Sequence, residues 1–161
     1  MKNFVLDADA LIKLTKTDLI KKISEKINLL ITEEVFNEAV IEGKNKLYKD
    51  AFIIEDLIKD KLIKKASIKL VKKELPDLGI GELSTLNAYE QNKANVIVSD
   101  DRRFLNILDE KSVKFTTPVS LMVAMHNKKL INKKDAIAGM NKIKNLVRKD
   151  VYESAIKEIG G

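Results

Sequence analysis

Cysteine is absent from this chain of 161 residues, and proline, glycine, histidine and tryptophan are scarce or missing. Without cysteine, the chain has no disulfides, no thiol nucleophile and no metal site built from thiolates. Two prolines and six glycines are too few for a long disordered linker. No apolar run approaches the roughly 18 residues that a membrane-spanning helix needs. We therefore expect a folded, cytoplasmic protein without a membrane segment.

Positive charge is distributed unevenly along the chain. Residues 1–110 hold 19 basic and 20 acidic side chains, whereas residues 111–161 hold 11 basic and 4 acidic ones, a net charge of +7. Such a positive field attracts a polyphosphate backbone or an acidic protein. A solvated lysine-rich surface explains the same pattern equally well, and the sequence leaves both interpretations open.

Short apolar runs alternate with helical patterns, which is typical of an α/β protein with a mostly parallel sheet covered by helices on both faces. The predicted strands cover residues 3–6, 28–31, 62–66, 96–99 and 113–115. The predicted helices run through Leu11 to Leu14, from Thr32 onwards, and over residues 45–59, 68–75, 81–92, 101–109, 118–128, 133–148 and 150–159. We predict a single domain over residues 1–161, with a core of about 1–117 and a basic helical extension of about 118–161.

Acidic side chains occur where the predicted strands end. Asp7 follows the first strand, Asp100 and Asp101 follow the fourth, and Glu82 lies in the first turn of the helix after Gly81. The carboxyl ends of parallel strands meet at one edge of a sheet, so these acids are expected to converge there. Converging carboxylates repel one another, and a hard divalent cation such as Mg²⁺ or Mn²⁺ relieves that repulsion.

Each of these acids also has a structural explanation. Asp7, Asp9 and Asp101 stand where the N-cap of a helix is expected, and a single Asp after a strand is more often a cap than a metal ligand. Taken together, acids at the ends of separate strands favour a metal site. The sequence does not exclude either interpretation.

A second acidic group lies on the predicted helix that follows Thr32. Glu34, Glu38 and Glu42 are spaced four residues apart and therefore line one helix surface. Spacing alone predicts a solvated acidic stripe and selects none of the three. Glu38 and Glu42 flank the apolar stripe of this helix, and Glu34 lies nearly opposite it.

Four stretches of the chain occur in the order FVLDADALIKL, ITEEVFNEAV, LGIGELSTLNAYE and VIVSDDRRF. Together they resemble the motifs of the PIN-domain nucleases, in particular the VapC-like proteins of prokaryotes, in a branch with a Gly-Glu third motif and a double Asp. The resemblance runs from residue 3 to about residue 106, and the tail RKDVYESAIKEI resembles the helical ending of that branch. It implies a three-layer PIN-like domain with a central sheet of four to five strands.

The resemblance assigns roles by position. Asp7, Glu38, Glu82 and Asp101 correspond to the four catalytic acids of the family. The implied ligands of Mg²⁺ or Mn²⁺ are Asp7, Glu82, Asp100 and Asp101. Glu82 departs from the wider superfamily, in which an Asp is more common at this position, and its longer side chain could shift the bound ion.

Further positions around the last motif also match. Ser99 stands where the family often has Thr, and Asp9 where it often has Asn or Ser, so Asp9 is included among the candidate site residues. Ser99, Arg102 and Arg103 are expected to bind substrate, and a guanidinium group can contact phosphate through two hydrogen bonds. Alternatively, the two arginines pair with acids such as Asp9 or Glu110.

The resemblance implies a metal-dependent endoribonuclease in which a metal-activated water breaks a phosphodiester bond. It further implies the toxin of a VapBC-type toxin–antitoxin pair, with RNA, a small antitoxin protein and a second copy of the chain in a homodimer as partners. Two alternatives stay open, an RNA-processing nuclease outside a toxin system and a non-catalytic nucleic-acid-binding or assembly module. The complete set of four acids favours an enzyme over the last of these.

Overall fold

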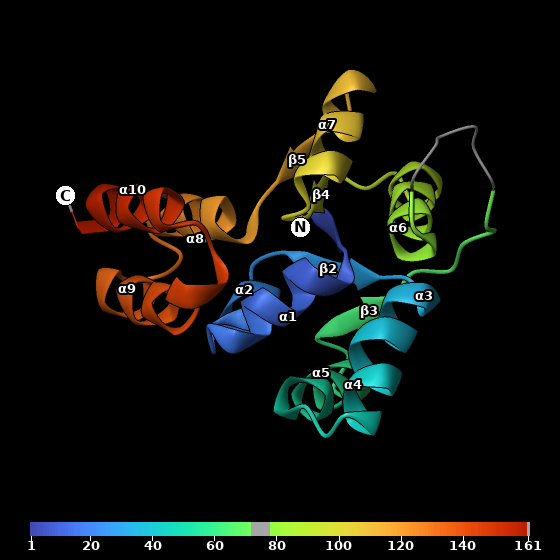
Figure 1. Ribbon diagram of the computed structural model, residues 1–161, viewed down its shortest axis with the longest axis horizontal. Helices are drawn as coiled ribbons and strands as arrows, with labels where there is room; N and C mark the ends of the chain where they lie inside the picture. The colour runs from blue at the N-terminus through green and yellow to red at the C-terminus, as the bar shows by residue number, and fades with distance from the viewer. Residues whose placement is uncertain (72–77, 161) are drawn as a thin grey trace.

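Five strands form one parallel sheet in the computed structural model, which describes residues 1–71 and 78–160 (Figure 1). They lie side by side in the order β3-β2-β1-β4-β5. The strands are β1 (Asn3–Leu6), β2 (Asn28–Ile31), β3 (Ile63–Lys65), β4 (Val96–Val98) and β5 (Phe115–Thr116). The Val, Ile, Leu and Phe residues of the central strands β1 and β4 are typical of strands that are buried on both faces, whereas the edge strands β3 and β5 are partly exposed.

Helices connect the strands, because a parallel pair needs a crossover between the end of one strand and the start of the next. The crossover elements are α1 (Ala8–Lys16), α2 (Ile20–Ser24), α3 (Glu33–Phe36), the π-helical η1 (Asn37–Glu42), α4 (Gly43–Asn45), α5 (Lys49–Lys59), α6 (Ile80–Gln91) and α7 (Arg102–Glu110). The chain continues with α8 (Pro118–Asn127), α9 (Lys133–Lys142), the 3₁₀ turn η2 (Lys144–Leu146) and α10 (Lys149–Gly160).

The two faces of the sheet bury two apolar cores. Val98 points into the larger core, which holds side chains of β1, β2, α1, α2, α5 and the C-terminal helices. The adjacent Ile97 points into the smaller core, where it packs with Leu86 of α6 and with Phe104 and Leu108 of α7. Successive side chains of a strand point to opposite faces, so β4 contributes to both cores. The predicted three-layer α/β fold is confirmed.

Strand order places the carboxyl ends of β1 and β4 next to each other. The chain passes from β1 to β2 and β3 on one side, and the later strands β4 and β5 lie on the other side of β1. The backbone N–H of Asp7 donates to the carbonyl oxygen of Val98 over 3.2 Å, which joins the two strand ends. In open α/β sheets, such a reversal of strand order leaves a crevice at the carboxyl edge.

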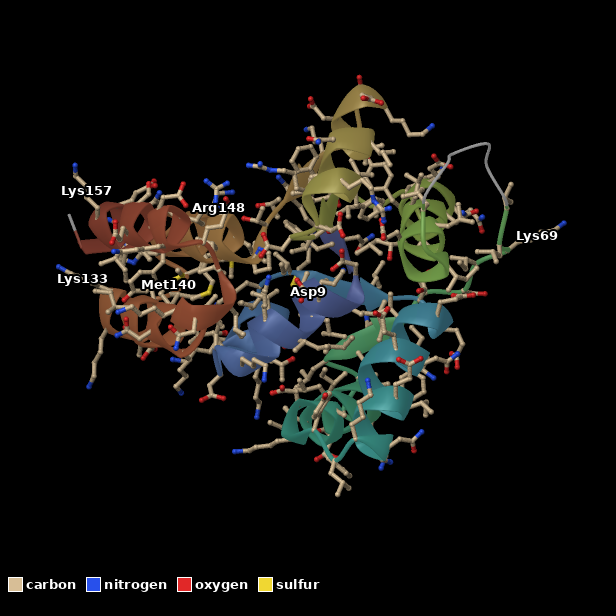
Figure 2. The ribbon with its side chains drawn as sticks, in the orientation of Figure 1. Asp9, Lys69, Lys133, Met140, Arg148 and Lys157 are labelled. Carbon is tan, nitrogen blue, oxygen red and sulfur yellow. The ribbon has the colours of Figure 1, made fainter. Side chains whose placement is uncertain are left out.

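The C-terminal helices pack on one another and on α1, so the predicted helical ending is confirmed. Thr117 caps α8, since its Oγ1 accepts a hydrogen bond of 3.1 Å from the N–H of Ser120. Met122, Met125 and Met140 are buried in the larger core, and Figure 2 labels Met140 among these helices. The division of the chain near residue 117 stays a prediction.

Three predicted boundaries were wrong. The helix predicted over 45–59 begins at Lys49, because Leu47 has a left-handed φ of 59° and breaks the helical path. The helix predicted over 133–148 ends at Lys142, where the buried Ile143 leaves the helical conformation. The strand predicted at about 113–115 is β5, which begins only at Phe115, because the N–H of Val113 still bonds to the carbonyl oxygen of Leu108 at the end of α7.

The helix predicted over 68–75 is absent from residues 68–71, which are extended, and its remainder lies outside the described residues. Two side chains of α6 hold this extended stretch. Asn87 accepts from the N–H of Val71 and donates to its carbonyl oxygen. Gln91 makes the same pair of hydrogen bonds with Lys69. These bonds satisfy the backbone groups that a helix would otherwise pair internally.

Candidate functional site

An open cleft of about 500 Å³ lies at the carboxyl edge of the sheet, where β1 and β4 end. Seven of the twelve residues that line it are acidic. When these side chains are ionised, the cleft attracts cations and repels the phosphates of a nucleic acid. The lining residues are Asp7, Ala8, Asp9, Glu34, Asn37, Glu38, Glu42, Gly79, Ile80, Gly81, Glu82 and Asp101.

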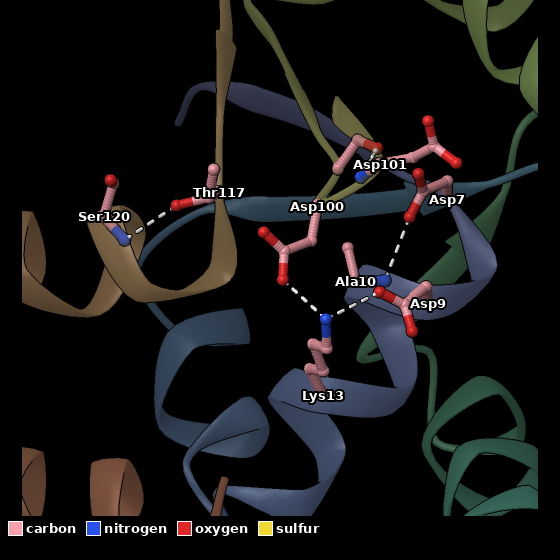
Figure 3. Close-up of polar contacts among 9 residues, drawn as sticks. Asp7, Asp9, Ala10, Lys13, Asp100, Asp101, Thr117 and Ser120 are labelled. Carbon is pink, nitrogen blue, oxygen red and sulfur yellow. Dashed lines mark hydrogen bonds and ion pairs between the residues drawn. The ribbon is translucent and has the colours of Figure 1, made fainter. Parts of the chain in front are cut away.

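Asp7 is buried at the start of α1 and caps that helix. Its Oδ1 accepts a hydrogen bond of 2.9 Å from the N–H of Ala10 (Figure 3), and only 6% of the residue is exposed. Burial raises the pKa of Asp7 to about 6, although hydrogen bonds from Ser99 and Ala10 lower it and the charges of Asp9 and Glu82 raise it further. The same side chain is therefore both a helix cap and a cleft carboxylate.

Asp101 caps α7 in the same way, since its Oδ1 accepts a hydrogen bond of 2.9 Å from the N–H of Phe104. Ser99 lies between the two caps. Its Oγ accepts from the N–H of Asp101 over 3.2 Å, and its hydroxyl donates to Asp7. Ser99 is fully buried and is not one of the residues that line the cleft. Ser99 therefore links Asp7 and Asp101 through hydrogen bonds. Its contact with substrate stays a prediction.

Glu82 lies in the first turn of α6. Its Oε1 is 3.4 Å from Nη2 of Arg103, and its carboxylate accepts from the N–H of Gly79. Its Oε2 is buried and has no hydrogen-bond partner in the described part of the chain. Burial and the charge of Asp101 raise the pKa of Glu82, and Arg103 lowers it. An unpaired buried carboxylate oxygen is unfavourable unless a cation or a donor meets it.

Glu38 approaches the start of α6 closely. A Cβ atom at Gly81 would lie 3.2 Å from its Oε2, so the glycine leaves room for the carboxylate. Burial raises the pKa of Glu38, and the charges of Glu42 and Asp9 add to this effect. A carboxylate with a raised pKa is a better proton acceptor near neutral pH.

Glu34 and Glu42 line the cleft together with Glu38. The helix changes from α3 to the π-helical η1 at Asn37. A π-helical turn contains more residues than the 3.6 of an α-helical turn. Glu38 and Glu42 are four residues apart, so their side chains are more closely aligned along the helix axis than in an α-helix. The Oε2 atom of Glu34 is buried and has no hydrogen-bond partner among residues 1–71 and 78–160.

Lys13 of α1 lies between two acids from different parts of the chain (Figure 3). Its Nζ is 2.9 Å from Oδ2 of Asp9 and 2.5 Å from Oδ2 of Asp100. Burial lowers the pKa of Lys13, but hydrogen bonds to Asp100 and Asp9 outweigh it, so the pKa is raised and the charge retained. The carboxylate of Asp100 is therefore paired with the ammonium group of Lys13. Asp100 is not one of the residues that line the cleft.

The two arginines of the last motif begin α7 and are exposed, and neither lines the cleft. Arg103 pairs with an acid, as the alternative interpretation predicted. The partner is Glu82, and not Asp9 or Glu110. Arg102 lines a neighbouring hollow together with Asp100. Their contact with substrate stays a prediction.

The structure thus brings five of the predicted site residues to one cleft. These are Asp7, Asp9, Glu38, Glu82 and Asp101. Four predicted residues lie beside or behind it, namely Ser99, Asp100, Arg102 and Arg103. Sequence reasoning missed Lys13, whose one local signal is its position four residues after Asp9 on the same helix. It also missed Asn37, which lines the cleft without any signal in the sequence.

The cleft fits Mg²⁺ or Mn²⁺ by the chemistry of its donors, because carboxylate oxygens are the ligands that these hard cations prefer. The unpaired buried oxygens of Glu34 and Glu82 supply free lone pairs. In the part of the chain that the structure describes, no three acidic or histidine side chains are grouped closely enough to hold one metal ion. The carboxylates would therefore have to converge further when an ion binds.

Comparison with known proteins identifies the fold family. A family model described as a PIN domain matches residues 3–161, which is nearly the whole chain. Searches of curated proteins and of solved structures found no match. None of the helices in the described residues is long and apolar enough to cross a membrane. PIN domains are usually nucleases. The chain belongs to the PIN-domain family.

Proposed function

We propose that this PIN-domain protein is a metal-dependent endoribonuclease and the toxin of a VapBC-type toxin–antitoxin pair. The observation that carries the nuclease activity is the convergence of Asp7, Glu38, Glu82 and Asp101 on one cleft from four separate elements. The choice of RNA and the toxin role rest on the resemblance of the four motifs to VapC-like proteins.

The negative charge of the cleft favours the binding of a cation. A phosphodiester cannot approach this many ionised carboxylates unless positive charge offsets theirs. Asp7, Glu82 and Asp101 are the residues that would hold Mg²⁺ or Mn²⁺, since all three line the cleft and two of them have raised pKa values. Such an ion, when bound, polarises a phosphoryl oxygen and lowers the pKa of a coordinated water.

Glu38 is the proposed general base, because its raised pKa suits it to accept a proton from the attacking water. The water oxygen attacks phosphorus in line with the 3′ oxygen. The P–O3′ bond breaks, and the departing 3′ oxygen takes a proton from solvent. The products carry a 5′-phosphate and a 3′-hydroxyl, and the 2′-hydroxyl of RNA takes no part.

Arg103 is the proposed phosphate contact of this reaction. Its pair with Glu82 is long at 3.4 Å, and 56% of its side chain is exposed. Exposed pairs of this kind hold weakly, so a phosphate oxygen can compete for the guanidinium group. Arg103 would then turn from Glu82 to the substrate, and Glu82 would become free for the cation.

One observation favours a second candidate, a nucleic-acid-binding module without catalysis. Within the described residues, no three acidic or histidine side chains are grouped to hold an ion. The basic C-terminal third would then bind nucleic acid by charge alone.

Cleavage of defined RNAs with mapped ends separates the two candidates. The wild-type protein should cut in Mg²⁺ or Mn²⁺ but not in EDTA, and Asp101→Asn should lower the rate by about 100-fold or more. Asp109→Asn is the matched control, because it makes the same change at an exposed acid on the same helix outside the cleft. Its rate should equal that of the wild type.

Equal cleavage by the wild type and Asp101→Asn would refute the proposal, because the activity would come from a contaminant. RNA binding without cleavage would favour the second candidate. Induced expression tests the toxin role, since the wild type should stop the growth of a bacterial host and Asp101→Asn should not. We also propose a homodimer, which predicts the mass of two chains in sedimentation experiments.

A further inference from the structure

Lys13 carries a positive charge directly beside the acids of the cleft. Its Nζ contacts one carboxylate oxygen of Asp9 and one of Asp100, at 2.9 Å and 2.5 Å (Figure 3). Only 13% of the lysine side chain is exposed. An ammonium group held between two carboxylates is a built-in counter-ion, and the contact with Asp100 is the better shielded from water of the two.

The two partners of Lys13 are carboxylates that a second metal ion could use on the side of the cleft where β1 and β4 end. Sites with two metal ions place them about 3.5 to 4 Å apart and require further carboxylates to hold the second ion. Asp9 is two residues from Asp7, and Asp100 is next to Asp101 in the chain. Asp9 and Asp100 are therefore additional carboxylates beside the ends of β1 and β4, and Lys13 pairs with both.

We propose that the ammonium group of Lys13 takes the place of a second metal ion, so that the cleft binds one divalent cation per chain. The inference rests on the proposed function, since it concerns the metal site of that nuclease. Lys13 is in this view a positioning residue, because it acts through Asp9 and Asp100 and is not itself one of the residues that line the cleft.

The fold keeps the lysine in this position. Asp9 and Lys13 are four residues apart on α1, with the acid on the N-terminal side, which is the favourable order for such a helix pair. Asp100 lies 87 residues further along the chain, so its contact joins α1 to the turn after β4. Removing the lysine leaves the exposed Asp9 and the half-buried Asp100 without their counter-charge, and a new cation would then be attracted to them.

Counting bound Mn²⁺ tests the proposal. The electron paramagnetic resonance signal of free Mn²⁺ gives the number of ions bound per chain as the metal is titrated. The wild type should bind one ion. Lys13→Met frees two carboxylates and should bind two. Lys16→Met is the matched control, because Lys16 lies on the same helix and pairs with Asp50 at 2.5 Å. It should bind one ion.

Further variants keep the test decisive if Lys13→Met does not fold, as judged by circular dichroism. Lys13→Arg retains the charge and should bind one ion, and Lys13→Gln removes it with a polar side chain and should bind two. The double variant Lys13→Met, Asp100→Asn should return to one ion, since a donor for the second ion is lost.

Two ions in the wild type, or one ion with unchanged affinity in both Lys13→Met and Lys13→Gln, would overturn the inference while the nuclease proposal stands. No Mn²⁺ binding by the wild type would overturn both. Loss of RNA cleavage in Asp101→Asn with a wild-type count of one ion would support both.

Discussion

Asp7 shows how one residue joins folding and function in this chain. Its side chain caps α1 and is buried, so ionising it in the folded protein is unfavourable. Hydrogen bonds from Ser99 and Ala10 offset only part of this cost, and the pKa stays raised at about 6. At pH values between 3.8 and about 6, the folded chain binds a proton at Asp7 that the unfolded chain has lost. The contribution of Asp7 to stability therefore falls as the pH rises through this range.

Urea unfolding of the metal-free protein from pH 4 to pH 7 tests this behaviour. The wild type should lose about 2 kcal/mol more of its unfolding free energy over this range than Asp7→Asn, which has no carboxyl group at this position. Glu38 and Glu82 also have raised pKa values, but they are present in both proteins. The exposed Asp109→Asn should keep the wild-type slope. Identical slopes in wild type and Asp7→Asn would contradict a buried, ionisable Asp7.

Single residues could be predicted where a strand end or a helix start fixes their place. Asp7 and Asp101 were expected either as N-caps or as cleft acids, and each of them is both. Lys13 could not be predicted in this way, because its second partner, Asp100, is 87 residues away and the contact exists only in the folded chain. A local pattern cannot show which distant side chain a lysine will meet.

The start of α6 illustrates what an element adds to the site. Gly81 lies in its first turn, where alanine would favour the helix by about 1 kcal/mol. A Cβ atom there would lie 3.2 Å from Oε2 of Glu38, which is closer than most contacts of a Cβ atom. Helix stability therefore favours alanine at position 81, whereas the position of the Glu38 carboxylate favours glycine.

Gly81→Ala should separate the effect on helix stability from the effect on the position of Glu38. We expect the unfolding free energy to stay equal or rise by up to about 1 kcal/mol, while RNA cleavage falls roughly tenfold because Glu38 is displaced. Gly160→Ala on α10 is the control, since its added Cβ would meet no atom within 4 Å, and it should cleave like the wild type. Chemical unfolding and initial cleavage rates measure the two effects. Unchanged cleavage by Gly81→Ala would argue against a catalytic role of Glu38.

Elements were predicted well where hydrophobic periodicity decides the outcome and poorly where long-range contacts decide it. The apolar run at β4 predicted a buried strand, and its side chains fill both cores. Residues 68–71 had a helical pattern, yet Asn87 and Gln91 of α6 take their backbone hydrogen bonds and keep them extended. The sequence did not predict the π-helical turn η1, which is a rare form of helix.

At the scale of the whole molecule, acidic and basic regions are separated. The cleft is lined by acids, whereas residues 111–161 carry a net charge of +7. Figure 2 places Lys133 and Lys157 on the C-terminal helices, Arg148 just before α10, and Asp9 near the centre of the molecule. Under the proposed function, an RNA strand that is cut in the cleft would gain its affinity from the C-terminal helices, because long-range attraction and bond cleavage need not come from the same residues.

Salt dependence of RNA binding tests this separation, measured with Asp101→Asn so that the RNA stays intact. Each phosphate contact to a single strand contributes about 0.7 to the slope of log affinity against log salt. Lys128→Gln with Lys129→Gln should therefore reduce the slope by about 1.4. Lys61→Gln with Lys64→Gln removes the same charge from exposed positions of the neutral body and should not change it. Equal slopes for the two pairs would mean that the lysine-rich ending is only solvated, and that RNA is held elsewhere.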